Sequence, residues 1–211
     1  MLTRRHLGLA AAAALLAGGG AVAQGAMAQG AGPVIGQPAP AFSAVDANGQ
    51  TRSLAQYRGK TVVLEWTNHE CPYVKKHYSG NMQALQRAAT ADGVVWLSIV
   101  SSAPGEQGHV TGAQAKALTT SRNAAPTAVL LDPEGRVGRL YGAKTTPHMF
   151  VINPQGQVVY AGGIDDVPTN KVEDLKRAKP LVQMALADLK AGRKVAVPAS
   201  RPYGCAVKYK A

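Results

Sequence analysis

The feature that most constrains this fold is a short apolar strand followed, after a short turn, by a helix with a cysteine at its N-terminus. Residues 61–66 are apolar, partly β-branched and six residues long, which is typical of a buried strand. After a short turn comes Cys71-Pro72, and apolar residues then recur every three or four positions through about Ala89. Proline suits the first helical position, where no N–H is needed. The sequence therefore predicts a strand–turn–helix unit with Cys71 at the helix N-terminus.

Strands and helices alternate after this unit. Apolar, β-branched stretches predict four more strands, at residues 93–100, 126–131, 148–152 and 157–161. Helical patterns occur near residues 113–121 and over about residues 172–190. The last two strands flank an Asn-Pro-Gln-Gly turn and so predict a hairpin. Parallel βαβ units followed by a hairpin predict an α/β fold, in which helices cover both faces of a central mixed sheet.

The N-terminal residues 1–28 have the pattern of an export signal. Arg4 and Arg5 precede an apolar run that is too short to span a membrane, and small residues follow at cleavable positions. The paired arginines resemble a twin-arginine signal, with an ordinary secretory signal as the alternative. We therefore expect a periplasmic protein in which residues 29–37 form a flexible lead into the domain.

Charge is concentrated near the C-terminus. The formal net charge is +11, and residues 171–211 hold ten Lys and Arg against three acidic residues. An exported protein does not meet DNA, so we expect a solvated basic surface, no nucleic-acid partner and no membrane contact. One domain is expected over residues 38–192. The basic arm that follows, residues 193–211, contains two prolines and a glycine, which predict an extended segment rather than a packed element.

Several short motifs resemble the redoxins, the peroxiredoxin-like branch (alkyl hydroperoxide reductase and thiol-specific antioxidant type) of the thioredoxin superfamily. In the N-terminal half they are Pro40-Ala41-Phe42, residues 46–49, Ser53-Leu54 and Tyr57-Arg58-Gly59-Lys60, ahead of the strand that ends in Trp66. In the C-terminal half they are Tyr141-Gly142, Thr146-Pro147 and residues 150–156. The resemblance covers about residues 38–190. It implies a thioredoxin-like fold with Cys71 at the redox position and a cis peptide bond before Pro147.

Two departures from these families bear on function. Thioredoxins carry Cys-x-x-Cys at this turn, whereas this chain has Val74 in place of the second cysteine, so the local disulfide cannot form. Peroxiredoxins place Thr or Ser three residues before their reactive cysteine, where this chain has Asn68, with Thr67 one position away. The chain looks most like redoxins with a second cysteine near the C-terminus. This likeness implies that Cys71 is the nucleophile and Cys205, the only other cysteine, its resolving thiol, with no cofactor and no metal.

Further site residues follow from the same resemblance. The residues expected to contact the substrate are Pro72, Tyr73, Thr146 and Pro147, and the backbone at Thr146 would pair with an extended substrate. A helix N-terminus favours a thiolate, so we expect the pKa of Cys71 to be lowered. Glu65 lies where thioredoxins keep a buried carboxylate. It either moves a proton to and from Cys71 or is a strand-end acid that faces solvent.

The expected activity is that of an oxidoreductase in thiol–disulfide exchange or peroxide reduction, which uses an external thiol reductant. The protein would act as a single chain or a homodimer. Two alternatives stay open. Cys71 and Cys205, with a histidine from His69, His77 or His148, would suit a copper carrier. A permanent bond between the two cysteines would instead fix the tail, and would stabilise the fold by about 5 kcal/mol on the chain-entropy model.

Overall fold

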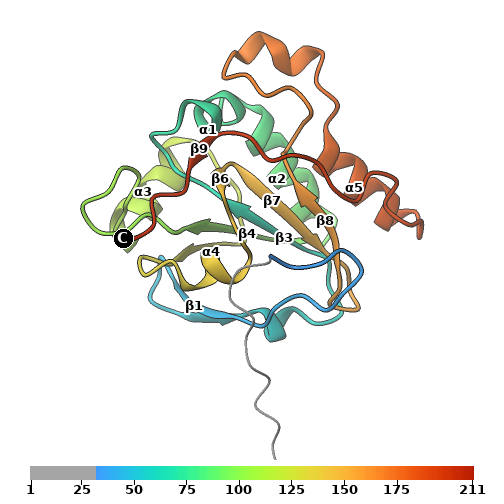
Figure 1. Ribbon diagram of the computed structural model, residues 1–211, viewed down its shortest axis with the longest axis horizontal. Coiled ribbons are helices and arrows are strands. Elements are labelled where there is room, and N and C mark those ends of the chain that lie inside the picture. Colours follow the sequence, from blue (N-terminus) through green and yellow to red (C-terminus); the bar gives the residue numbers. More distant parts are fainter. Residues whose placement is uncertain (1–31) are drawn as a thin grey trace, which may run out of the picture.

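The computed structural model describes residues 32–211, so the predicted export signal, residues 1–28, lies outside the described residues. The strands of its main sheet are β1 (Ser43–Asp46), β2 (Thr51–Ser53), β3 (Val62–Trp66), β4 (Val95–Val100), β5 (Ala128–Leu131), β7 (His148–Ile152) and β8 (Val158–Gly162). They lie in the order β2-β1-β5-β4-β3-β7-β8 (Figure 1). The β3, β4 and β5 strands are parallel, whereas β7 and β8 are antiparallel to their neighbours. The predicted mixed sheet and its terminal hairpin are confirmed.

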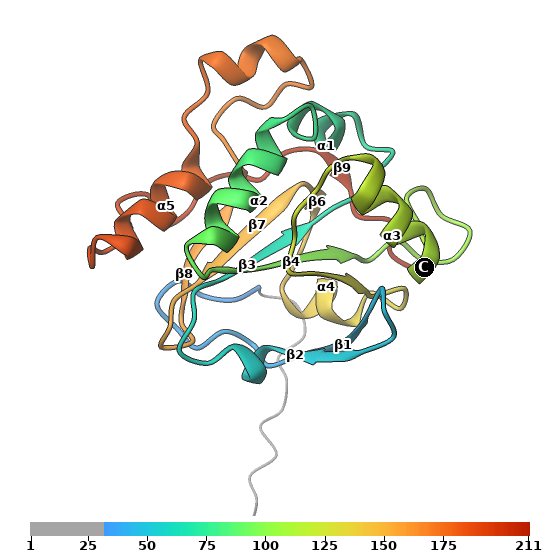
Figure 2. The same ribbon diagram turned by 180° about the vertical axis from the view of Figure 1, so that it is seen from behind.

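Helices cover both faces of this sheet (Figures 1 and 2). They are α1 (Pro72–His77), α2 (Asn81–Ala91), α3 (Gly112–Ser121), α4 (Arg136–Leu140) and α5 (Leu181–Lys190), with 3-10 turns η1 (Leu54–Tyr57) and η2 (Val172–Lys176). Successive residues of β3 face opposite sides, as in any strand. Val63 packs in the cluster with α2 and α5, whereas Leu64 and Trp66 pack in the cluster with α4. Within residues 32–211, no helix is long and apolar enough to cross a membrane.

Two of the predicted helices are broken in the structure. The pattern from Cys71 to Ala89 forms two helices, because Gly80 between them has φ +135°, a conformation that a helix cannot contain. The pattern over residues 172–190 also divides. Only its second half is α-helical, and Pro180 stands directly before Leu181, the first residue of α5. The prediction of single continuous helices was therefore wrong at both places.

The C-terminal arm, residues 193–211, is extended as predicted, but it is packed along the domain. It runs from the end of α5 across the top of the sheet towards α3 (Figure 1). On the way, β9 (Cys205–Ala206) pairs antiparallel with β6 (Thr145–Thr146) and forms a second, two-stranded sheet. Val207 N–H also donates to Lys144 O at 3.1 Å, and Ala103 N–H donates to Lys208 O at 2.8 Å. Upstream of Cys205, Ala161 N–H donates to Pro198 O and Ser200 N–H donates to Ala161 O, both at 3.1 Å, so backbone hydrogen bonds hold the arm on both sides of Cys205.

Candidate redox site

Cys71 lies at the junction of β3 and α1, where the sequence predicts it. It is the residue before Pro72, the first residue of α1, and Lys75 N–H donates to its carbonyl at 2.9 Å. Its side chain is fully buried. The thiol donates to Thr146 O at 3.1 Å, next to the Thr146-Pro147 peptide bond, which is cis as predicted. The strand–helix turn and the cis-proline strand therefore meet at one sulfur atom.

Cys205 is brought to the same place by the β6–β9 pairing. Cys205 lies directly opposite Thr146 in this ladder, and Thr146 is the residue whose carbonyl accepts from Cys71. Both cysteines are free thiols, Cys71 buried and Cys205 partly exposed. Gly204 lies so close to Thr146 O that a β-carbon there would overlap it. The arm therefore approaches the cis-proline strand in a way that only glycine permits at this position.

The pKa values of the two thiols are shifted in opposite directions. Burial opposes ionisation of Cys71, but hydrogen bonds to its sulfur from the Cys205 side chain and from the backbone of Val74 outweigh this effect and lower its pKa. Burial, followed by the hydrogen bond with Cys71, raises the pKa of Cys205 to about 11. The expected thiolate is thus Cys71, whereas Cys205 is expected to stay protonated.

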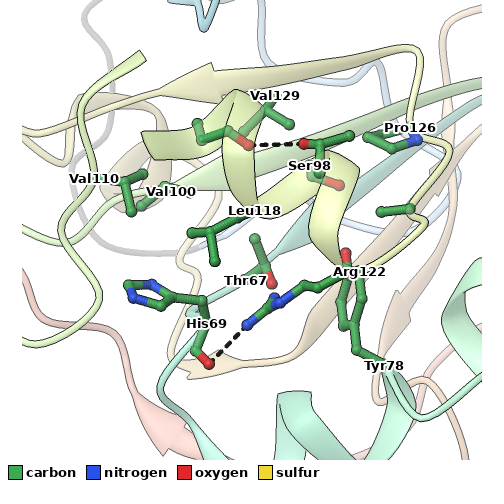
Figure 3. Close-up of a pocket in the computed structure, with 13 residues that line it drawn as sticks. Thr67, His69, Tyr78, Ser98, Val100, Val110, Leu118, Arg122, Pro126 and Val129 are labelled. Carbon is green, nitrogen blue, oxygen red and sulfur yellow. Dashed lines mark hydrogen bonds between the residues drawn. The ribbon is translucent and has the colours of Figure 1, made fainter. Parts of the chain in front are cut away.

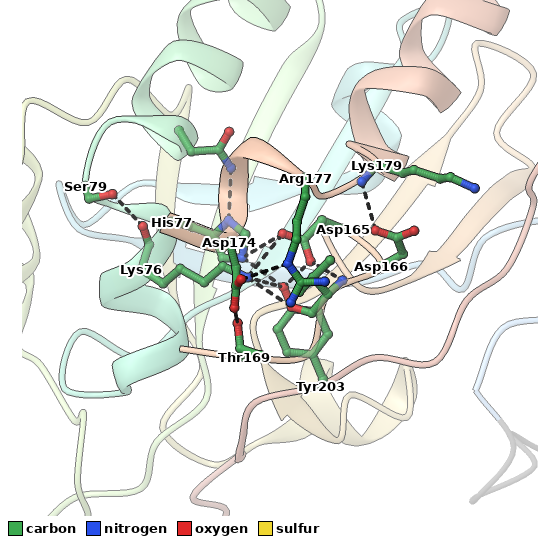
Figure 4. A network of polar contacts seen from close by, with 12 residues as sticks. Lys76, His77, Ser79, Asp165, Asp166, Thr169, Asp174, Arg177, Lys179 and Tyr203 are labelled. Carbon is green, nitrogen blue, oxygen red and sulfur yellow. Dashed lines mark hydrogen bonds and ion pairs between the residues drawn. The ribbon is translucent and has the colours of Figure 1, made fainter. Parts of the chain in front are cut away.

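Upstream of Cys205, Tyr203 anchors the arm in a buried polar cluster (Figure 4). Its hydroxyl donates to Asp165, accepts from Lys76 Nζ at 3.3 Å, and lies 3.1 Å from His77 Nε2. Lys76 also forms an ion pair with Asp165 at 3.3 Å, although both side chains are buried. Asn81 donates to His77 Nδ1 at 2.9 Å, which leaves the other ring nitrogen protonated and facing Tyr203. A neutral imidazole suits this site, since burial lowers the pKa of His77 to about 4.

Downstream of Cys205, Tyr209 forms a second anchor. Its hydroxyl donates to Ala143 O at 2.8 Å, and the guanidinium of Arg139 lies 4.7 Å from its ring centre. Tyr203, Tyr209 and Asp165 were not among the residues predicted from the sequence. The available signal was the presence of two tyrosines in a tail whose other residues are mostly charged or have small side chains. Large aromatic side chains bury the most apolar surface when they are packed, so tyrosines in such a tail favour contact with the domain.

Two of the residues predicted to bind substrate, Tyr73 and Thr146, contact the arm. Tyr73 packs edge-to-face against Tyr203, with ring centres 5.9 Å apart, whereas Pro72 is exposed. Thr146 and Pro147 are buried, and the backbone edge at Thr146 is paired with Cys205. The site that the sequence predicts for an extended substrate is therefore filled by the chain's own C-terminal segment.

Glu65 is fully buried at the end of β3 rather than facing solvent. Its carboxylate accepts from four side chains: Tyr78 at 2.8 Å, Gln86 at 3.1 Å, Trp96 at 2.7 Å and Ser98 at 2.8 Å. Among residues 32–211, no hydrogen bond joins Glu65 to Cys71. The second reading of this residue, a solvated strand-end acid, is wrong.

The turn before Cys71 uses Asn68 structurally. Its side chain accepts from Glu70 N–H at 2.9 Å and donates to Gln107 O at 3.2 Å, so it holds this turn against the loop that follows β4.

Among the described residues, no group of three or more His, Cys, Asp or Glu side chains is placed to hold a metal ion. His77 and His148 are buried, and Lys144 N–H donates to His148 Nδ1 at 3.3 Å.

Comparison with solved structures gives the same fold. An uncharacterized conserved protein from Geobacillus kaustophilus has a TM-score of 0.70 at 22% identity, covering 84% of this chain and 93% of that one. A hypothetical protein from Sinorhizobium meliloti has a TM-score of 0.70 at 22% identity, covering 87% and 98%. A putative thiol:disulfide interchange protein DsbE from Chlorobium tepidum has a TM-score of 0.50 at 23% identity, covering 61% and 84%.

No curated protein matches the chain. The model of the AhpC/TSA family, however, matches residues 35–161, which is more than half of the chain. Together with the thioredoxin-like neighbours, this match supports a redox role and an oxidoreductase kind of activity. The chain therefore belongs to the AhpC/TSA family, in the redoxin branch of the thioredoxin superfamily.

Proposed function

We propose that this protein is a thiol-dependent oxidoreductase in which Cys71 is the nucleophile and Cys205 of the same chain is the resolving thiol. The observation that carries the proposal is the β6–β9 pairing, which sets Cys205 opposite Thr146 while Thr146 O accepts from Cys71. The opposite pKa shifts of the two thiols support attack by Cys71 before Cys205, because the more acidic thiol is the one that supplies the thiolate. A homodimer is not needed for this pairing.

The proposed chemistry balances in two steps. With a hydroperoxide, the Cys71 thiolate attacks the peroxide oxygen, an alcohol or water leaves, and Cys71 becomes a sulfenic acid. The Cys205 thiol then displaces water and forms the Cys71–Cys205 disulfide. With a disulfide substrate, Cys71 instead forms a mixed disulfide, and Cys205 displaces the substrate thiol. In both cases two external thiols, or one external dithiol, return the pair to two thiols and are themselves oxidised to a disulfide.

Mass spectrometry of the oxidised protein tests the proposal. After one equivalent of peroxide or of a small disulfide, a peptide that links Cys71 to Cys205 is expected, together with the loss of both free thiols. The Cys71→Ser variant should consume no oxidant, whereas Cys205→Ser should consume one equivalent and stop at a sulfenic acid or mixed disulfide. Normal turnover by Cys205→Ser would exclude Cys205 as the resolving thiol.

A redox titration separates this scheme from a permanent structural bond. A working pair should be reduced by common thiol buffers. A structural disulfide should stay oxidised until the potential of the buffer falls below about −300 mV. Parallel assays with hydrogen peroxide and with a protein disulfide would identify the oxidant. A pair that stays oxidised under all these conditions would support the structural alternative.

We propose that Glu65 moves a proton for Cys71 only if its hydrogen bonds rearrange, since all four of its partners belong to the surrounding core. The Glu65→Gln substitution distinguishes the roles. A proton-transfer role predicts an altered pH profile of turnover, whereas a structural role predicts lower stability with an unchanged profile. The second result would remove Glu65 from the mechanism.

We also propose that the protein is exported to the periplasm, where oxidising conditions allow such a pair to work. The support is the N-terminal sequence pattern with paired Arg4 and Arg5. Fractionation of cells that express the native chain and an Arg4→Lys, Arg5→Lys variant tests this. Periplasmic recovery of the native chain alone supports twin-arginine export, and recovery of both in the periplasm points to the ordinary secretory route.

A further inference from the structure

A small cavity lies between α3 and the sheet, at the turn that precedes Cys71 (Figure 3). Its volume is about 40 Å³. One water molecule needs about 10–15 Å³ on this measure and takes up about 30 Å³ in the liquid, so the cavity has room for about three water molecules. This is the space of a small organic anion of about four or five covalently bonded non-hydrogen atoms. Val100, Val110 and Leu118 supply apolar walls, and Thr67, His69 and Arg122 supply polar groups. The cavity therefore has an apolar part and a polar end.

Arg122 gives the polar end a positive charge that no acidic side chain neutralises directly. It follows the last residue of α3, and its guanidinium donates to His69 O at 2.8 Å and lies 4.9 Å from the ring centre of Tyr78. Among residues 32–211, no carboxylate forms a salt bridge with it. The guanidinium has further N–H donors beyond this one bond, and burial lowers its pKa.

Thr67 supplies an independent sign of a ligand. Its residue is 9% exposed, its hydroxyl is buried, and no protein group described in the structure forms a hydrogen bond with that hydroxyl. Leaving such a group unpaired in the interior is unfavourable, so native proteins rarely do so without a reason. Because Thr67 and Arg122 line the same cavity from different elements, one bound molecule can contact both.

From these observations, we infer that this cavity binds a short-chain carboxylate, such as propionate, through Arg122 and Thr67. A carboxylate suits the planar donor arrangement of a guanidinium better than a spherical anion does, and its remaining lone pairs can accept from a threonine hydroxyl. A short hydrocarbon tail would contact the apolar walls. The carboxylates of Glu65 and Glu70 do not compete with such a ligand for Arg122, because both have other partners. Glu65 accepts from four side chains, and Glu70 accepts from Gly108 N–H at 2.6 Å.

Titration of the full chain, labelled with nitrogen-15, with sodium propionate tests this inference by NMR. Ionic strength and pH are held constant, and propionamide and sodium chloride serve as matched ligands. We expect saturable shifts of the Thr67, His69 and Arg122 amide signals with propionate, and binding at least about tenfold weaker with propionamide, which lacks the charge. Equal binding of propionamide, full competition by equimolar chloride, or shifts that do not saturate would overturn the inference.

Variants localise the binding. Arg122→Gln should weaken propionate binding at least about tenfold, and Thr67→Val, which keeps the shape, by about threefold. Arg122→Lys, which keeps the charge but not the planar donors, should fall between the native chain and Arg122→Gln and provides a second test if Arg122→Gln does not fold. Arg87→Gln is the matched control, because Arg87 is exposed and also donates to a backbone carbonyl, that of Asn123. Unchanged affinity in Arg122→Gln, or an equal loss in Arg87→Gln, would contradict the assignment.

Discussion

The two cysteines of this protein are held in place by different means. Cys71 is fixed by regular structure, since β3 lies in the middle of the sheet and α1 follows at once. Cys205 lies on an extended arm, which the β6–β9 pairing, further backbone hydrogen bonds and two tyrosine anchors attach to the domain. Displacing Cys71 would require the core to unfold, whereas displacing Cys205 requires only local contacts to break. The proposed nucleophile is thus part of the core, and its proposed resolving partner is attached to the domain by the arm.

The acidities of the two thiols provide the sharpest test of this difference. The pKa of Cys71 is lowered and that of Cys205 is raised to about 11, so Cys71 should ionise at a lower pH than Cys205. Reduced protein labelled with carbon-13 at the cysteine β-carbons can be titrated by NMR. The buried sulfur of Cys71 should ionise first and the more exposed Cys205 near pH 11. The reverse order, or a single shared step near the ordinary value, would contradict the assignment of roles.

Acid should weaken the protein through His77, under the arm, and His148, in the sheet. Burial lowers both pKa values to about 4, from 6.5 in an unfolded chain. As pH falls, the unfolded chain takes up these protons first, so stability is complete above pH 6.5 and is lost between pH 6.5 and pH 4. Each imidazole should account for about 3 kcal/mol of this loss.

Urea unfolding at several pH values measures this effect. The His77→Gln and His148→Gln variants should each show a smaller change in the free energy of unfolding between pH 6.5 and pH 4 than the native chain does. A free energy of unfolding that stays constant across this range in the native protein would mean that the imidazoles are protonated or exposed in the folded state.

The Gly204→Ala substitution should detach the arm locally without removing a functional group. A β-carbon at this position would overlap Thr146 O, and the residue has φ +140°. We expect disulfide closure after oxidation to slow about tenfold, since strain of this kind costs about 1–3 kcal/mol. Gly192→Ala is the matched control, because Gly192 also has a positive φ but open space around it. Similar slowing in both variants would show that backbone strain alone, and not contact with Thr146, is responsible.

Removing the hydroxyl of Tyr203 or of Tyr209 should have the smallest of these effects. The two variants show which tyrosine contributes more to the attachment of the arm. Tyr203 bonds to three buried polar side chains, whereas Tyr209 donates to one carbonyl, so Tyr203→Phe should destabilise the arm by about 1 kcal/mol more than Tyr209→Phe does. Hydrogen exchange at the amides of Cys205 and Val207 reports the opening of the arm. Faster exchange in Tyr209→Phe than in Tyr203→Phe would reverse the proposed order of the anchors.

Local patterns in the sequence predict the strands of the sheet and the position of Cys71, because each depends on residues close together in the chain. The cis bond before Pro147 was implied by the resemblance to the redoxins, and the structure has it. Local patterns do not predict the breaks at Gly80 and Pro180, where a single backbone preference overrides the apolar periodicity on either side. The attachment of the arm is also missed. Its contacts join residues far apart in sequence, such as Tyr203 and Lys76, and composition alone favours a loose tail. The placement of Thr67 and Arg122 around one cavity is hidden for the same reason.

The unequal exposure of the two sulfurs sets a direction for the reverse reaction. In the proposed disulfide, an incoming thiol would reach the partly exposed Cys205 sulfur more readily than the buried sulfur of Cys71. Attack there expels Cys71, which is the better leaving group because its pKa is the lower of the two. Access and leaving-group ability thus favour the same bond cleavage. The reductant would be linked transiently to the arm, and the nucleophile would be regenerated in its reactive, ionised form.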